Sequence, residues 1–321
     1  MAQPTGAFSS YDSIGNREDL SDIIFDVSPT DTPVITAIKK KKATATNHEW
    51  QTDILEAAAN NAHIEGNDAA PAVNAATVRL SNQTQIFKKH AVITGTQEKV
   101  DKAGRKSEMA YQVARRLKAI KRDLERAIMG VNNAKVVGND TTAREMASIQ
   151  PFLTTNTAAG TGGSDGASSG GTARTDGTQR ALTEALLETV LQSVWDNSGD
   201  SENLMLCVGS FNKGVVSNFT TGAATRYVTT DDKKLVASID VYVGDFQTLK
   251  VVPNRFYDAT RGARDALVLN PDYIALAELR PTQSYDLAKT GDSFRKEIVE
   301  ECTLEMCQEA ASGGVFDLTT S

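Results

Sequence analysis

The chain has 321 residues, of which 40% are hydrophobic and 23% charged, so it can bury one large core or two modest ones. Its formal net charge of −7 argues against a dedicated DNA-binding protein, because such proteins gain most of their affinity by neutralising phosphates with excess Lys and Arg. The three cysteines, Cys207, Cys302 and Cys307, do not form the pattern of a disulfide framework and fit a reducing compartment.

The N-terminal region is predicted to be an extended arm. Residues 1–40 hold few apolar groups, and Pro29 and Pro33 disfavour regular helix around them. A short amphipathic segment is expected at residues 18–27. No signal-peptide core is present, and no run approaches the roughly 18 apolar residues that cross a bilayer. We therefore expect a soluble, unexported protein with no membrane partner.

Four consecutive lysines, Lys39–Lys42, follow the arm. The simpler interpretation is that they form a solvated surface, because charge runs usually do. The alternative is that they dock against acidic residues, and the sequence does not decide between the two.

Two alternating stretches predict a long hairpin. In the first, Trp50, Thr52 and Ile54 share one face; the second runs from Val78 to Ile93, and a polar tract of small residues separates them. An isolated hairpin is at best marginally stable in water, so one of this length needs a neighbour to lie on. The sequence leaves open the alternative that the hairpin folds back on its own domain.

The longest helical pattern covers residues 105–130. Apolar residues at spacings of three and four place one stripe along it. The stripe contains Met109, Val113, Leu117, Ile120, Leu124 and Ile128. The other faces carry eight cations: Arg105, Lys106, Arg115, Arg116, Lys118, Lys121, Arg122 and Arg126. A solvated face is expected, and the alternative is that these cations meet an acidic surface on another subunit.

The second half of the chain predicts a mixed domain. A glycine- and serine-rich tract, residues 158–172, lacks the apolar groups needed to order itself and predicts a flexible loop. A helix with one broad buried face is expected over residues 178–197. The expected later elements are a buried strand at 204–208, a short helix capped by Ser210, a hairpin from 239–243 and 249–252, a buried strand at 266–269, and a long strand at 298–306 with one solvated face.

The sequence contains no recognisable catalytic motif. His48, His63 and His90 lack the close spacing of a zinc site, and no phosphate-binding loop or nucleophile motif occurs. Carboxylates are adjacent at positions 231–232 and 300–301, but neighbouring strand residues face opposite ways and neighbouring loop acids are usually solvated. We therefore predict no catalytic, cofactor-binding or metal-binding residues, no cofactor and no enzymatic activity.

Four stretches carry a family resemblance, in addition to the order of arm, hairpin, long helix, mixed domain and final strand. They are SIGNREDLSDIIFDVSPTDTP (13–33), ATNHEWQTDIL (45–55), GTQEKVDKAGRKSEMAYQVARR (95–116) and GGVFDLTTS (313–321). These phrases resemble one subfamily of the tailed-phage major capsid proteins with the HK97 fold. The resemblance covers most of the chain and is weakest in the glycine-rich tract.

The resemblance implies an α+β HK97-like capsid fold with six segments. Residues 1–43 would be the N-terminal arm, 44–96 the extended β-hairpin called the E-loop, 97–157 the peripheral domain with a long spine helix, 158–177 a flexible glycine-rich loop, 178–285 the axial domain, and 286–321 the C-terminal strand returning to the peripheral domain.

The resemblance also implies a function. Such proteins form the hexamers and pentamers of an icosahedral head shell enclosing double-stranded DNA, in a virion assembled in the bacterial host cytoplasm. The expected partners are other copies of the chain, with scaffolding, portal and decoration proteins as further partners and only weak, non-specific contact with packaged DNA. Since no long segment precedes the arm, any scaffolding protein is expected to be separate. The alternatives are an encapsulin-like compartment shell, or a soluble enzyme or binding module with unfamiliar motifs.

Overall fold

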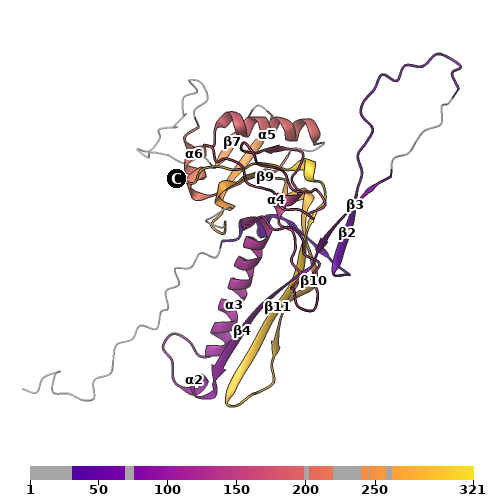
Figure 1. The fold of residues 1–321 in the computed structure, drawn as a ribbon. Coiled ribbons are helices and arrows are strands. Elements are labelled where there is room, and N and C mark those ends of the chain that lie inside the picture. The colour runs from indigo at the N-terminus through magenta and orange to yellow at the C-terminus, as the bar shows by residue number, and fades with distance from the viewer. Residues whose placement is uncertain (1–30, 69–75, 199–201, 220–239, 245, 258–261) are drawn as a thin grey trace, which may run out of the picture.

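A computed structural model describes residues 31–68, 76–198, 202–219, 240–244, 246–257 and 262–321. Most of the predicted arm, including residues 18–27, lies outside the described residues. The strands form a four-stranded, a six-stranded and a two-stranded sheet. Figure 1 shows the four-stranded sheet and a long helix extending from below the six-stranded sheet, while a hairpin projects to one side. Within the described residues, no helix meets the length and apolarity that a membrane span requires.

The four-stranded sheet combines strands from distant parts of the chain. In order across the sheet these are β1 (Lys39–Lys42), β10 (Ile274–Asp286), β11 (Ser293–Met306) and β4 (Gln85–Thr94). The β10–β11 and β11–β4 pairs are antiparallel, and β1 runs parallel to β10. The long final strand is confirmed as β11, and it lies in the middle of the sheet.

The lysine run of β1 is matched with acidic residues of the same chain. Lys40 Nζ lies 2.6 Å from Glu278 Oε1, and Lys41 Nζ lies 2.7 Å from Glu305 Oε1. The four lysines are exposed, so these ion pairs add little individually. Of the two interpretations of the run, docking against acid describes the structure better.

The predicted long helix is confirmed as α3 (Glu108–Glu125), which continues as the π-helical turn η1 (Arg126–Gly130). It begins after Ser107, whose Oγ accepts a hydrogen bond from the Ala110 N–H, a favourable N-cap. Gly104, with φ +73°, lies in the turn that precedes the helix.

The predicted apolar stripe is correct at its ends and wrong at Leu117. Met109 packs in a small cluster with Ala91 and Ile93, and Leu124 belongs to the main core. Leu117 lies between these two clusters and is 37% exposed. Periodicity gives the direction of a side chain, but it does not show whether another element lies opposite.

The six-stranded sheet has a hydrophobic cluster on each face. Its strands, in order, are β5 (Thr157–Ala158), β12 (Gly313–Val315), β9 (Ala266–Leu269), β6 (Leu204–Val208), β8 (Thr248–Pro253) and β7 (Val241–Val243). On one face, Leu206 and Val268 pack with helix α5 (Glu184–Asn197). On the other, Cys207 and Leu267 join the main core, which continues to α3 and β11. A continuous apolar core therefore connects the two large sheets.

Most predicted elements of this region are present, with shifted boundaries. The two buried strands are β6 and β9, and β7 pairs antiparallel with β8 as expected. Helix α5 begins at Glu184 because Thr183 is its N-cap. Gly209, and not Ser210, caps α6 (Ser210–Ser217). The remaining helical turns are α1 (Pro33–Ala37), α2 (Gly95–Lys99), α4 (Ile149–Phe152), η2 (Gly262–Arg264), η3 (Pro271–Tyr273) and η4 (Glu309–Ala311).

The prediction that the glycine-rich tract cannot order itself is wrong. Ser164 and Thr175 exchange two backbone hydrogen bonds of 3.2 and 3.1 Å, and Asp165 forms an ion pair with the buried Arg174. Gly170 lies against Phe152 so closely that a Cβ would come within 2.7 Å of its ring. The tract is ordered by hydrogen bonds and close backbone packing, which a count of apolar residues does not detect.

Candidate assembly surfaces

The hairpin consists of β2 (Asn47–Thr52) and β3 (Val78–Gln83), which pair with Trp50 opposite Leu80. At the base of the hairpin, Trp50 is buried, and its ring centroid lies 6.1 Å from that of Phe152. Trp50 and Phe152 both belong to the main hydrophobic core. Contacts with the core of the subunit therefore hold the base of β2 in place.

The base of β3 is held by Asn82, which is fully buried. Its Nδ2 donates to the carbonyl oxygen of Leu304 at 2.9 Å, and its Oδ1 accepts from the Ala147 N–H at 2.9 Å. Lys135 Nζ donates to the carbonyl oxygen of Ser81 at 3.0 Å. Since buried hydrogen-bonding groups are costly to leave unpaired, these contacts fix the position of the hairpin on the subunit.

At Thr84, between β3 and β4, the chain passes from the two-stranded to the four-stranded sheet. The Thr84 hydroxyl donates to Glu301 Oε1 at 2.9 Å. Arg144 Nη2 and Arg280 Nε lie 2.7 Å from the two oxygens of the same carboxylate. Glu301 is 4% exposed, so the predicted solvated face of β11 is wrong here: cations from other segments cover it.

A second buried carboxylate, Glu305, links the arm, the hairpin and β11. Its oxygens lie 2.7 Å from Lys41 Nζ and 3.0 Å from His48 Nε2, and Cys307 Sγ donates to it. Burial alone would raise the pKa of Glu305, but the hydrogen bonds from His48, Lys41 and Cys307 outweigh burial and lower that pKa to about 2. The hydrogen bond to Glu305 also raises the pKa of Lys41.

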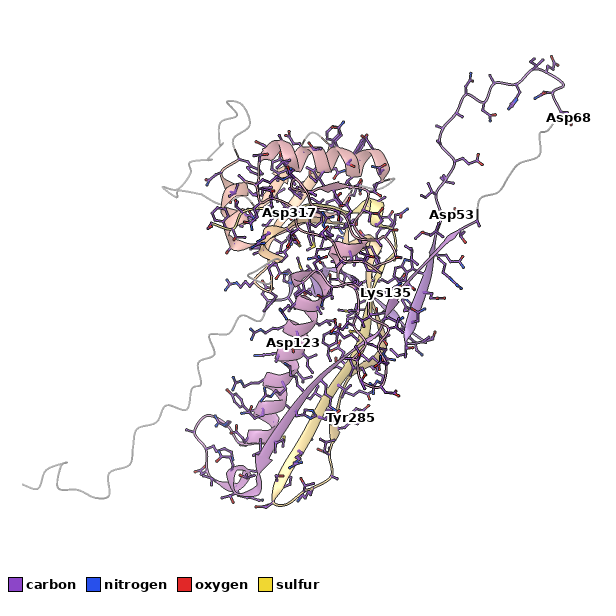
Figure 2. The ribbon with its side chains drawn as sticks, in the orientation of Figure 1. Asp53, Asp68, Asp123, Lys135, Tyr285 and Asp317 are labelled. Atoms are coloured by element: carbon purple, nitrogen blue, oxygen red, sulfur yellow. The ribbon has the colours of Figure 1, made fainter. Side chains whose placement is uncertain are left out.

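The tip of the hairpin differs from its base. Ile54, Leu55 and Ile64 are all exposed, and Leu55 is 94% exposed. Residues 53–77 contain four acids and no Lys or Arg: Asp53, Glu56, Glu65 and Asp68. In Figure 2, Asp53 lies where the strands end and Asp68 lies at the far end of the loop. The hairpin projects from the subunit, which rules out the alternative that it folds back.

One face of the four-stranded sheet also exposes apolar side chains. Phe87, Ala91 and Ile93 of β4 are buried, whereas the alternating residues Ile86 and Val92 are exposed. In register across the strands, Tyr285 lies opposite Glu297 and Glu297 opposite His90, which places exposed Tyr285 on the same face as Ile86 and Val92. The cations Lys88 and Arg295 lie on this face as well, and Lys88 Nζ pairs with Glu297 Oε1 at 2.9 Å. Glu301, opposite Ile86, is covered on this face by Arg144 and Arg280, so the free part begins beside it. We call it the free sheet face.

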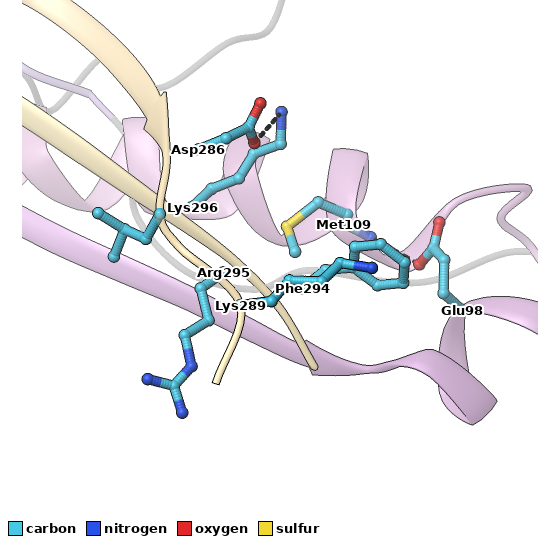
Figure 3. Close-up of a pocket in the computed structure, with 8 residues that line it drawn as sticks. Glu98, Met109, Asp286, Lys289, Phe294, Arg295 and Lys296 are labelled. Atoms are coloured by element: carbon cyan, nitrogen blue, oxygen red, sulfur yellow. Dashed lines mark hydrogen bonds and ion pairs between the residues drawn. The ribbon is translucent and has the colours of Figure 1, made fainter. Parts of the chain in front are cut away.

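Figure 3 shows a cavity of about 390 Å³ at the far end of the β10–β11 hairpin. Its acidic groups are already engaged in structural contacts. Asp286 pairs with Lys296 at 3.1 Å, and Glu98 accepts hydrogen bonds from the Ser107 hydroxyl and from two backbone N–H groups at the start of α3. The cavity therefore resembles a structural groove more than a catalytic pocket.

The three histidines and the adjacent acids considered in the sequence analysis have separate partners in the structure. His48 pairs with Glu305, His63 contacts Asn61 in the exposed loop, and His90 lies 3.8 Å from Glu297. Among the described residues, no three His, Cys, Asp or Glu side chains form a group that could hold a metal. Glu300 accepts a hydrogen bond from the Thr282 hydroxyl, whereas Glu301 binds Arg144 and Arg280. The acids at 231–232 lie outside the described residues.

The charged contacts at the hairpin base were not identified from the sequence. The long strand was expected to have one solvated face, whereas cations and His48 from other segments cover Glu301 and Glu305 on that face. Two features of the sequence could have indicated these contacts. One is the lysine run at 39–42, and the other is the set of glutamates at 300, 301 and 305 in a strand that also contains Cys302 and Leu304. Acids among apolar strand residues predict ion pairing when the strand is buried.

A family model described as SU10 major capsid protein matches residues 3–319. The chain belongs to the SU10 major capsid protein family. The major capsid protein of Escherichia phage Phieco32 is 38% identical over 130 residues, which are 40% of this chain and 37% of that protein. The alignment therefore spans little more than a third of that relative.

Solved capsid structures share the fold over nearly the whole chain. "Capsid of empty GTA particle computed with C5 symmetry" has a TM-score of 0.64 at 12% identity, covering 97% of this chain and 98% of that one. The mature capsid of bacteriophage PhiM1 gives 0.62 at 10% identity, covering 100% and 97%. At this identity the likeness establishes the fold alone. The predicted α+β HK97-like fold is confirmed, and the family match favours a phage capsid over an encapsulin-like compartment.

Proposed function

We propose that this protein is the major capsid subunit of a tailed-phage head, assembling as hexamers and pentamers into an icosahedral shell around double-stranded DNA. The observation that carries the proposal is the projecting hairpin, whose base is anchored and whose apolar tip is exposed, in a chain of a major capsid protein family. Fully burying Ile54, Leu55 or Ile64 would stabilise the assembly by about 1.5 to 3 kcal/mol each. A neighbouring subunit can supply that burial.

The free sheet face is the surface that best complements the tip. It combines exposed Ile86 and Val92 with Arg295 and with Lys88, which already pairs with Glu297, whereas the tip combines apolar residues with four acids. We infer that the tip of one copy covers the free sheet face of the next. Apolar contacts would provide most of the affinity, and the opposite charges would set the orientation.

The division of the chain follows the sheets. We propose residues 1–43 as the arm and 44–96 as the hairpin and its return strand. The peripheral domain would contain α3 and the four-stranded sheet, to which the arm contributes β1 and the hairpin segment contributes β4. It would also contain β10, which the expected axial segment 178–285 includes, because β10 pairs with β11. The six-stranded sheet would form the axial domain, and the C-terminal segment would contribute β11 to the first sheet and β12 to the second.

The role we propose is structural and not enzymatic. The charged clusters in the described residues stabilise the fold, since Glu301 is paired with two Arg side chains and Glu305 with Lys41 and His48. Scaffolding, portal and decoration proteins are partners that a capsid role allows, and the virion would be the site of action after assembly in the host cytoplasm.

Deleting residues 60–76 tests the role of the tip. We expect the variant to remain folded, by circular dichroism and thermal melting, but to form no shells by electron microscopy under conditions in which the unmodified chain forms them. Normal shells from the deletion variant, or its global unfolding, would contradict the proposal. Failure of the unmodified chain to form shells when co-expressed with its neighbouring phage genes would reject the capsid function itself.

A further inference from the structure

The exposed side of α3 carries four cations that the described part of the chain leaves without an acidic partner. Arg116, Lys118 and Lys121 are exposed and form no ion pair or hydrogen bond with any described residue. Arg115 contacts a ring only, with its guanidinium carbon 5.7 Å from the centroid of Tyr111. At 3.6 residues per turn, Arg115, Lys118 and Lys121 project within about 120° of one another, and Arg116 projects from the neighbouring flank. We call these four residues the basic face of α3.

The acids of α3 do not neutralise this face. Glu108 pairs with Arg105 at the start of the helix, Asp123 pairs with Lys89 of β4 at 2.6 Å, and Glu125 is fully buried. A chain with a net charge of −7 thus presents a local excess of positive charge on one helix. A cationic surface on an acidic protein attracts anionic partners at short range while the rest of the molecule repels them.

The composition of the basic face fits a polyanion better than a protein surface. Among the described residues of α3, Leu117 is the only large apolar side chain that is exposed, at 37%. Protein interfaces have apolar cores from which Lys is depleted, whereas the phosphates of nucleic acids are contacted mainly by Arg and Lys. The apolar surfaces, namely the free sheet face and the hairpin tip, are elsewhere. In Figure 1 the hairpin and α3 lie to either side of the strands.

We propose that the basic face of α3 binds the phosphate backbone of double-stranded DNA, which places α3 on the DNA-facing side of the shell. The proposal rests on the capsid function, because the packaged genome is then the polyanion enclosed. From residue 115 to 121 the helix rises about 9 Å, a length of duplex that carries roughly five phosphates. Arg115, Lys118 and Lys121 can therefore meet phosphates together, and Arg116 would need to reach around from the flank of the helix.

The interaction is expected to be weak and independent of base sequence. With four phosphates neutralised at most, the logarithm of the binding constant should fall by about 3.6 for each tenfold increase in salt concentration. Weak interactions repeated over many subunits hold a polymer by multivalency while allowing each segment to release. This would restrain the packaged DNA without clamping it.

Binding of a short random-sequence duplex to the unassembled subunit, measured by fluorescence anisotropy across a salt series, tests the proposal. In the test variant Arg115, Arg116, Lys118 and Lys121 are replaced by Gln. In the control variant Lys42, Lys99, Lys250 and Lys289, exposed lysines elsewhere in the chain, are replaced by Gln, so that the net charge changes equally. We expect the test variant to bind with most of the affinity abolished, and its salt dependence to fall by about 0.9 for each phosphate that is no longer neutralised. The control should keep the salt dependence of the unmodified chain.

Three results would overturn the proposal. One is the absence of DNA binding by the unmodified chain at low salt. Another is an equal loss of affinity in both variants, which would show that only net charge matters. The third is a test variant that binds DNA normally but no longer assembles, which would show that the basic face contacts an acidic surface of another copy and not DNA. Shell formation by the unmodified chain is scored separately, so that failure of the capsid function is distinguishable from failure of this inference.

Discussion

The base and the tip of the β2–β3 hairpin are built on different principles. At the base, Trp50 and Asn82 are buried against the subunit, and Glu305 binds both His48 of the hairpin and Lys41 of the arm. At the tip, Leu55 is almost fully exposed. The base therefore contributes to the stability of one subunit, while the tip contributes nothing comparable until a partner covers it. Substitutions at the two ends should separate folding from assembly.

The largest effect on folding is expected from Trp50→Ala. Removing a buried Trp side chain that packs on Phe152 should lower the free energy of unfolding by about 3 to 5 kcal/mol. Chemical denaturation of the unassembled subunit measures it. Trp195→Ala is the matched control, because Trp195 is 51% exposed and should cost much less. Equal costs for the two substitutions would show that the hairpin base is not part of the core.

Low pH should destabilise the base of the hairpin by protonating Glu305. Its pKa is about 2 in the folded chain and near 4.5 when unperturbed, so the unfolded chain binds a proton more readily. The stabilisation is complete above about pH 4.5 and is lost as the pH falls through about 2, with a total of at most about 3 kcal/mol. Unfolding measured across this range should therefore show a steeper loss of stability in the unmodified chain than in Glu305→Gln. Identical pH profiles would contradict the assignment.

A smaller effect is expected from Asn82→Ala. The substitution leaves the buried Ala147 N–H and the Leu304 carbonyl oxygen without this partner, which should cost about 1 to 3 kcal/mol. Asn61→Ala is the control, since among the described residues Asn61 bonds only to His63 in the exposed loop. Hydrogen exchange at the Ala147 amide provides a local reading: it should accelerate in Asn82→Ala alone. Unchanged exchange there would show that Asn82 does not hold the hairpin.

The sequence predicted those features that depend on local periodicity. The spacing of apolar residues identified α3, and continuous apolar runs identified β6 and β9. The two alternating stretches around a polar tract predicted the hairpin but left open whether it folds back. The second stretch was predicted as one long strand, whereas only β3 pairs with β2 and β4 joins the four-stranded sheet. These signals succeed because side-chain direction repeats every 3.6 residues in a helix and every two in a strand.

Features that depend on distant segments were predicted less well. Glu301 is buried because Arg144 and Arg280, far away in the chain, reach its carboxylate. Leu117 is exposed because neither neighbouring cluster extends to it, although its spacing matches that of Leu124. The glycine-rich tract is ordered by backbone hydrogen bonds, which composition does not encode. In each case tertiary contacts decide the outcome, and a single sequence does not show which segments meet.

The smallest effect on folding is expected at the tip. Replacing Leu55 and Ile64 by Ser should change the free energy of unfolding by no more than about 0.5 kcal/mol, because both side chains are already in contact with water. Shell formation should nevertheless fall sharply, since the burial that a neighbour would provide is removed. The measurement pairs denaturation of the subunit with the yield of shells by electron microscopy, using Thr77→Ser at the root of the loop as a control. If the double variant were destabilised as much as Trp50→Ala, the tip would belong to the core of its own subunit. If it formed shells in normal yield, the apolar side chains of the tip would not be what joins neighbouring copies.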